Sequence, residues 1–214
     1  IFTILEPTKP EPPVTKCIDI YNNSNGGLST YQDSSTFNNM DIYNNSGAAC
    51  AGASIKGPLN VFTNSLIYNN TALGDSSECP FPIFNRGGGL CISGSETVIS
   101  GVEVYGNTAC AGGGISIPDN ISTLNISNVS VYNNEAMYYG GGVYMNGDFF
   151  QTSSLGYITG MIISNNTARY GGGVFVDRRS GIIANSTIEN NTSFGGGGIY
   201  LNDAKIVHIV ETTI

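Results

Sequence analysis

The stretch IISNNTARYGGGVFV, residues Ile162–Val176, contains the pattern that decides the fold. A short apolar run leads to two asparagines, a polar gap separates these from three glycines, and a second apolar run follows. Variants of this pattern occur seven times in the 214 residues, at steps of 22 to 37 residues. Repeats of this length are typical of solenoids, in which each copy forms one stacked unit.

Each copy contains three short runs of alternating apolar residues, separated by residues that favour turns. In the run before the asparagines, one column holds a β-branched residue in all seven copies: Ile20, Ile42, Ile67, Val104, Val131, Ile163 and Ile188. Period-two alternation of β-branched residues predicts a strand that buries one face. Three such strands per repeat, without an amphipathic helix, predict an all-β chain: a single-stranded parallel β-helix of about seven coils.

The second asparagine of the pair is present in every copy, whereas the first is replaced once, by Gly106. Stacked at the roughly 4.8 Å spacing of neighbouring strands, asparagine amides can hydrogen-bond to one another along a ladder. We therefore predict a structural ladder, and we assign the left-handed corner conformation to the same column. Its members are Asn23, Asn45, Asn70, Asn107, Asn134, Asn166 and Asn191.

Glycine clusters follow most of the asparagine pairs, as at Gly112–Gly114 and Gly171–Gly173. They fit a second sharp corner, where a positive φ or a close backbone approach excludes a Cβ atom. A phosphate-binding loop is the competing explanation, but it requires a strand–loop–helix unit, and no helix pattern follows any cluster. We therefore expect the glycines to be structural.

The copies resemble a known family of repeats. Ile163-Ser164-Asn165-Asn166 followed by Gly172-Gly173-Val174 is similar to the paired FxxN and GGA[ILV] motifs of the polymorphic outer-membrane-protein repeat family. Ile or Val stands in place of Phe, and Gly in place of Ala. The resemblance covers about residues 17–210 and implies a right-handed parallel β-helix passenger on a cell surface, often adhesive. The fold carries little information about activity, because β-helices host many functions.

The composition excludes several classes of partner. The net charge is −8 with only eight lysines and arginines, which argues against nucleic acid and against an anionic membrane surface. The sequence contains no run of about twenty apolar residues, which a membrane-spanning helix requires. It also contains no cofactor or metal motif. We expect one elongated domain at residues 17–214, roughly 34 Å long, preceded by a separate segment at residues 1–16.

Nine Asn-x-Ser/Thr triplets are candidate N-glycosylation sites, which low charge content and an extracellular location would favour. Chance triplets in an Asn-, Ser- and Thr-rich chain are the alternative. The candidates are Asn22, Asn44, Asn69, Asn120, Asn125, Asn128, Asn165, Asn185 and Asn190. Neighbouring coils would hold glycans only about 5 Å apart, so we expect partial occupancy, with Asn120, Asn128 and Asn185 the least crowded.

The five cysteines fit no zinc motif, and an extracellular protein favours disulfides. The disulfide candidates are Cys50, Cys79, Cys91 and Cys110. Cys50 and Cys110 lie two coils apart, beyond the roughly 7 Å limit between Cα atoms. The longer loop that carries Cys79 can bring it to either, so we predict one bridge that involves Cys79, with Cys50 or Cys110.

The two ends of the repeat array suggest contacts with other copies. An apolar strand, Ile1–Leu5, precedes a proline-rich spacer that favours an extended conformation. It either folds back onto the first coil or adds to the open edge of another copy. The sequence ends in an alternating strand in which we expect His208 to face solvent. The predicted subunit-contact residues are Ile1, Phe2, Ile4, Leu5, Ile206 and Ile209.

A row of tyrosines on the outward face of the first strand is the candidate binding surface: Tyr21, Tyr43, Tyr68, Tyr105 and Tyr132. Asp19, Asp41 and Glu103 lie beside it. The row either stabilises the ladder by ring stacking or binds sugars or a partner fibre. No basic residue accompanies these acids, so we predict no catalytic residue and no enzyme.

Three functions follow from these features, in order of preference. The first is an extracellular structural protein, an N-glycosylated subunit of a surface fibre that assembles head to tail from copies of itself. The second is a cell-surface adhesin or carbohydrate-binding passenger, with glycans as partners. The third is a polysaccharide lyase or hydrolase.

Overall fold

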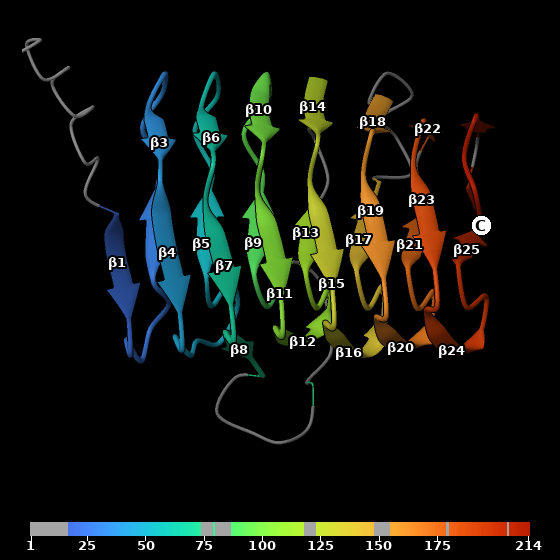
Figure 1. Cartoon of the computed structure of the whole chain (residues 1–214), viewed down its shortest axis with the longest axis horizontal. Helices are drawn as coiled ribbons and strands as arrows, with labels where there is room; N and C mark the ends of the chain where they lie inside the picture. Colours follow the sequence, from blue (N-terminus) through green and yellow to red (C-terminus); the bar gives the residue numbers. More distant parts are fainter. Residues whose placement is uncertain are drawn as a thin grey trace, which may run out of the picture.

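The computed structural model describes residues 17–73, 79, 87–117, 123–147, 155–178, 180–204 and 206–214. Within these ranges the chain forms 26 strands and no helix. Every pair of neighbouring strands is parallel, and the strands stack along one axis (Figure 1). The predicted all-β parallel β-helix is therefore confirmed. No helix in the described part of the chain is long and apolar enough to cross a membrane.

Three sheets of seven strands form the walls of the β-helix. The first sheet contains β1 (Ile18–Tyr21), β4 (Met40–Tyr43), β7 (Leu66–Tyr68), β11 (Glu103–Tyr105), β15 (Ser130–Tyr132), β19 (Ile162–Ser164) and β23 (Thr187–Glu189). The second contains β2 (Leu28–Thr30), β5 (Ala53–Ile55), β9 (Leu90–Ile92), β13 (Ile115–Ile117), β17 (Val143–Asn146), β21 (Val174–Asp177) and β25 (Ile199–Asn202). The third contains β3 (Thr36–Asn38), β6 (Val61–Thr63), β10 (Thr97–Ser100), β14 (Thr123–Ser127), β18 (Leu155–Thr159), β22 (Ser180–Ala184) and β26 (Val207–Val210).

A shorter corner sheet joins the first sheet to the second, and the sequence analysis missed it. It contains β8 (Thr71–Ala72), β12 (Thr108–Ala111), β16 (Glu135–Tyr139), β20 (Thr167–Tyr170) and β24 (Thr192–Gly195). Its register shifts between Ala109 and Ala111, and again between Ala136 and Tyr139. Such irregularity interrupts the alternation of side chains, so periodicity alone gives no clear strand signal there.

The core is the narrow space between the three walls. The predicted column is in register, with Ile20 opposite Ile42 and Val131 opposite Ile163. Inner members such as Ile42, Ile67 and Val104 are 0% exposed. Side chains of one kind repeat from coil to coil, so each coil buries its apolar face against the coils beside it.

The left-handed corner lies one residue earlier than predicted. Positive φ angles of 54° to 62° occur at the first position of each pair: Asn22, Asn44, Asn69, Gly106, Asn133, Asn165 and Asn190. This explains why Gly106 is tolerated there, since glycine adopts positive φ without strain. The second asparagines turn their amides inward, so they carry the ladder and not the corner. The assignment of both roles to the second column was wrong.

A second left-handed column, which sequence reasoning also missed, lies where the third sheet leads into the first. Its φ angles are between 46° and 63°, and its members are Asn39, Asn64, Gly101, Asn128, Gly160, Asn185 and Glu211. Asparagine and glycine fill six of these seven positions, as the conformation favours. From β4 to β23, the strands of the first sheet are therefore bounded by left-handed residues at both ends.

The glycine clusters form the corner before the second sheet, as predicted. Gly112, Gly140 and Gly171 begin their clusters with positive φ angles of 61° to 66°, and Gly196 has the same conformation in the last cluster, with φ 64°. A Cβ atom at Gly141 would lie 2.5 Å from the Thr167 carbonyl oxygen and 2.6 Å from that of Gly172. Backbone oxygens cannot move away cheaply, so close approach excludes any larger residue.

Candidate functional site

The ladder of seven asparagines is continuous from Asn23 to Asn191. At each step the Nδ2 amide of one asparagine donates to Oδ1 of the next at 2.8 to 3.0 Å. The backbone N–H of the same residue donates to that oxygen as well, as from Asn45 to Asn70 at 3.0 Å. The five inner members are at most 1% exposed. Buried amides with all bonds made specify the register of the coils.

The predicted tyrosine row forms a second ladder, on the outside of the first sheet. The rings of Tyr21, Tyr43, Tyr68, Tyr105 and Tyr132 stack with centroids 4.9 to 5.0 Å apart and planes within 6°. Both faces of each inner ring lie against its neighbours. A sugar that stacks on an aromatic face would reach only the outer faces of Tyr21 and Tyr132. The geometry therefore favours stabilisation over carbohydrate stacking, and this surface presents mainly ring edges and hydroxyls.

The surroundings of three tyrosine hydroxyls in the row favour their neutral, protonated form. The Tyr132 hydroxyl donates a hydrogen bond to the Glu103 carboxylate at 2.9 Å. Partial burial, this hydrogen bond and the charge of Glu103 together raise the pKa of Tyr132 to about 12. Burial and nearby acids raise the pKa of Tyr68 and Tyr105 in the same direction. Tyr68, Tyr105 and Tyr132 therefore stay protonated at neutral pH and do not supply a phenolate.

The acids at the beginning of the first sheet come together as predicted. Asp19 pairs in register with Asp41, and the Cys17 thiol lies within 4.8 Å of both carboxylates. Partial burial, a hydrogen bond to Asp41 and the negative charges of both acids raise the pKa of Cys17. A protonated thiol is a poor metal ligand. Glu103 lies two coils away from Asp41, with Leu66 between them.

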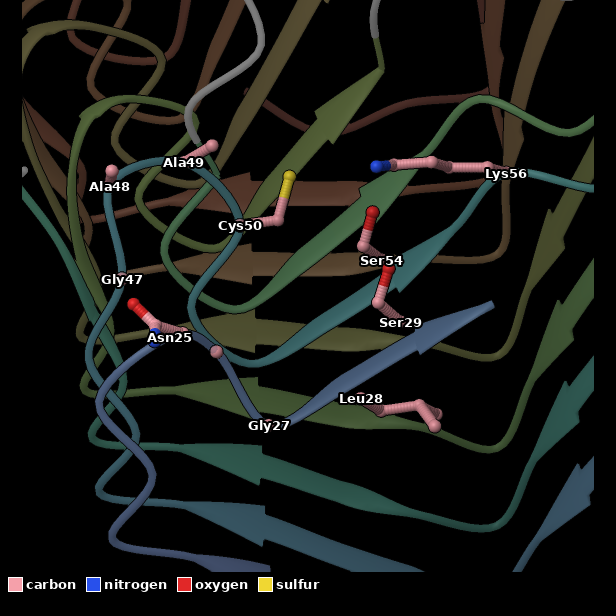
Figure 2. A pocket seen from close by; sticks show the side chains of 11 residues that line it. Asn25, Gly27, Leu28, Ser29, Gly47, Ala48, Ala49, Cys50, Ser54 and Lys56 are labelled. Atoms are coloured by element: carbon pink, nitrogen blue, oxygen red, sulfur yellow. The ribbon is translucent and has the colours of Figure 1, made fainter. Parts of the chain in front are cut away.

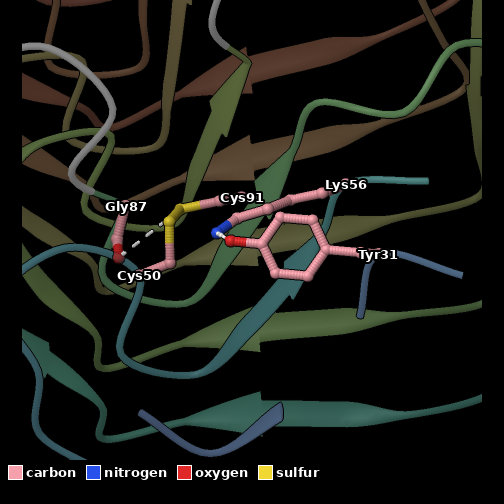
Figure 3. Close-up of a disulfide and its surroundings, with 5 residues drawn as sticks. All are labelled: Tyr31, Cys50, Lys56, Gly87 and Cys91. Carbon is pink, nitrogen blue, oxygen red and sulfur yellow. Dashed lines mark hydrogen bonds between the residues drawn. A yellow bond between two sulfur atoms is a disulfide. The ribbon is translucent and has the colours of Figure 1, made fainter. Parts of the chain in front are cut away.

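The structure contains two disulfides. Cys79 bonds to Cys110, one of the two partners predicted for it. The second bridge, from Cys50 to Cys91, was not predicted as a pair, although both residues were candidates (Figure 3). The sequence signal for this bridge was the alternation of side chains in β9, which turns Cys91 outward. The loop at Cys50 folds over the same outer face. Among the described cysteines only Cys17 is outside a disulfide.

The glycosylation candidates lie at the surface. All eight described acceptors have exposed side chains: Asn22, Asn44, Asn69, Asn125, Asn128, Asn165, Asn185 and Asn190. Asn120 lies outside the described residues. Five of the eight acceptors are first asparagines of a pair and occupy the first left-handed corner. The prediction had assigned that corner to the second asparagines. Asn128 and Asn185 lie two coils apart in the second left-handed column, with Gly160 between them, which leaves more room around each.

The end coils expose apolar side chains. Ile206 is 58% exposed and Ile209 is 42% exposed, and His208 faces solvent as predicted. Ile209 extends the core column above Ile183, so its exposure results from its place in the last coil. The predicted contact residues Ile1, Phe2, Ile4 and Leu5 lie outside the described residues.

An aromatic cluster outside the second sheet was missed. The outward residues Tyr144, Phe175 and Tyr200 follow one another in register, and Tyr139 and Tyr170 of the corner sheet pack against them. Phe175 and Tyr200 are stacked, with centroids 5.3 Å apart. The sequence signal for this cluster was the alternation of side chains in the apolar runs after the glycines, which turns every second residue outward.

Comparisons of the chain with models of protein families, with curated proteins and with solved structures find no match.

Proposed function

We propose that the chain is a subunit of an extracellular fibre, in which N-glycosylated copies join head to tail. The observation that carries this proposal is the complementarity of the two end coils. The strands β1, β2 and β3 form one edge of the three large sheets, and β23, β25 and β26 form the other. Among the described residues no strand lies beyond β1, β2, β3, β25 or β26, and open parallel edges favour the addition of another strand.

The ends of the asparagine ladder fit each other. Asn191 donates its amide to the Ile163 carbonyl, but among the described residues no further asparagine accepts from its backbone N–H. Asn23 at the opposite end has an Oδ1 atom that accepts no hydrogen bond from the described residues. Placing Asn191 of one copy below Asn23 of the next would repeat the inner step of the ladder.

The side chains at the two ends also fit. The same register would place Ile188 against Ile20 and Ile209 against Phe37, so the core columns would continue. Contacts of this kind are heterologous, and when repeated they generate open filaments. Thr213 pairs with Thr187 and occupies the start of the edge at β23. A complete junction along the first sheet therefore displaces residues 213–214.

An extracellular location is supported by the two disulfides, which persist in oxidising compartments. It is also supported by the exposure of every described glycosylation acceptor. Secretion of the chain from eukaryotic cells, followed by peptide N-glycosidase treatment and mass spectrometry, would measure occupancy. We expect glycans at Asn128 and Asn185, and an unmodified chain would refute this part of the proposal.

Assembly is tested by measuring native mass by light scattering across about a hundredfold range of protein concentration. We expect the mass to rise with concentration and Ile209→Lys to abolish this rise, because a lysine would bury a charge in the junction. Ile162→Lys is the matched control, since Ile162 is 51% exposed on the side of the rod. A monomer at every concentration, or equal effects of the two variants, would refute the proposal.

A further inference from the structure

A cavity of about 310 Å³ lies on the outer face of the second sheet, in the first two coils (Figure 2). Its floor is formed by β2 and β5, which supply Leu28, Ser29 and Ser54. The loop at 47–50 forms a wall, and Lys56 lies at the opposite rim. The volume is at the lower limit of small-molecule sites, which span about 300–1,000 Å³, so the cavity suits a ligand of monosaccharide size.

The loop that walls the cavity is fixed in place. The disulfide between Cys50 and Cys91 ties it to β9 of the next coil, with Cα atoms 5.9 Å apart. Gly47 donates its backbone N–H to the Thr71 carbonyl at 3.0 Å. A wall held at both ends preserves the shape of the cavity, and such preorganisation lowers the entropic cost of binding.

The polar groups of the cavity are available to a ligand. Ser54 is only 4% exposed, and its hydroxyl makes no hydrogen bond to any described residue. Because Ser54 lines the cavity, a ligand there can reach this hydroxyl. Ser29 precedes Ser54 in the same outward column, and Figure 2 shows both hydroxyls below the Lys56 ammonium. Two hydroxyls beside one ammonium match a hydroxylated ligand.

Among the described residues that line the cavity, Lys56 is the one that carries a charge. Its ammonium donates to the Tyr31 hydroxyl at 2.6 Å and lies 4.3 Å from the centre of that ring. These contacts hold the side chain over the cavity, and an ammonium has three protons to donate. The chain as a whole carries a net charge of −8. A local positive charge in such a field suits a single carboxylate better than a polyanion.

We propose that this cavity binds a sugar-sized carboxylate, namely a hexuronic acid. In this arrangement Lys56 pairs with the carboxylate, Ser29 and Ser54 bond to ring hydroxyls, and the Ala48 methyl group contacts the C–H face. The site lies on the side of the β-helix, so it is independent of the fibre proposal.

The test is a titration of the full ¹⁵N-labelled chain with sodium D-glucuronate, followed by amide chemical shifts. We expect saturable shifts confined to the cavity residues, with a dissociation constant on the order of 1 mM. D-Glucose lacks the carboxylate and acetate lacks the ring, so each should bind at least about tenfold more weakly. Equal binding of either control ligand, or no localised shifts up to about 20 mM glucuronate, would overturn the proposal.

Variants locate the binding to named groups. Lys56→Gln should weaken glucuronate binding about tenfold, because it removes a charge-assisted hydrogen bond. Ser54→Ala should weaken it several-fold. Arg169→Gln is the matched control, since it removes a positive charge that lies on the corner sheet beside Tyr170. Lys56 is exposed, so its replacement leaves the fold intact. Unchanged affinity in Lys56→Gln, or an equal loss in Arg169→Gln, would contradict the assignment.

Discussion

Replacement of Asn107 by alanine measures how much the asparagine ladder stabilises the fold. Asn107 is fully buried, and its Oδ1 atom accepts from the backbone N–H and the Nδ2 amide of Asn70 at 3.0 and 2.9 Å. Its own amide donates to the Ile67 carbonyl at 3.0 Å. Alanine removes these three buried hydrogen bonds, although the Asn70 amide keeps its second bond, to the Ile42 carbonyl. At about 1–2 kcal/mol each, the loss of unfolding free energy is about 3–6 kcal/mol.

Asn23→Ala provides the matched control, because it changes the same column at its exposed end. Within the described structure no donor points at the Asn23 Oδ1 atom, and its amide lies at the surface. We expect a loss of about 1 kcal/mol or less. Urea unfolding followed by far-ultraviolet circular dichroism gives both values. If the two variants lose the same free energy, the buried hydrogen bonds of the ladder are not the source of its stability.

Three further predictions concern the outer ladder and the disulfides. Tyr68→Ala removes two stacked contacts, so urea unfolding should show a loss of about 1–3 kcal/mol. Because the folded pKa of Tyr132 is raised from 10.0 to about 12, its contribution to stability is complete below pH 10 and is lost as pH rises towards 12. Glu103→Gln should lower the pKa of Tyr132 in a spectrophotometric titration at alkaline pH, and an unchanged value would contradict the role of the carboxylate. Cys50→Ser opens a bridge across 41 residues and should lower the unfolding free energy by about 2–5 kcal/mol, whereas an unchanged urea midpoint would show that the bridge does not form.

The fold could be predicted from the sequence because the repeats can be aligned with one another, coil by coil. An aliphatic residue at Ile42, Ile67 and Val104 implies a shared column, and the structure places all three in the core. The same comparison identified the asparagine and tyrosine ladders, since identical side chains at one position of each repeat must stack. Alternation within a strand then separated the buried face from the exposed face.

The errors arose where side-chain identity does not report backbone conformation. Two adjacent asparagines have the same chemistry, so the sequence did not show which one turns the corner and which one bonds inward. The single substitution at Gly106 was the available signal, because glycine is the residue that replaces asparagine at positive φ.

The cavity at Lys56 could not be predicted, because its parts come from separate coils. The disulfide to Cys91 fixes the loop at 47–50 over the second sheet, and this pairing was not known from the sequence. Ser29 and Ser54 alternate as any exposed strand residues do. Their common orientation below Lys56 becomes visible only when the coils are stacked.

Electron microscopy of the assembled chain tests the central claim, that rods of seven coils join end to end in continuous register. Seven coils at about 4.8 Å predict unbranched filaments with an axial repeat of about 34 Å, which averaged images would resolve as a layer line. Separate particles at high concentration, or filaments whose repeat does not match a whole number of coils, would contradict the account.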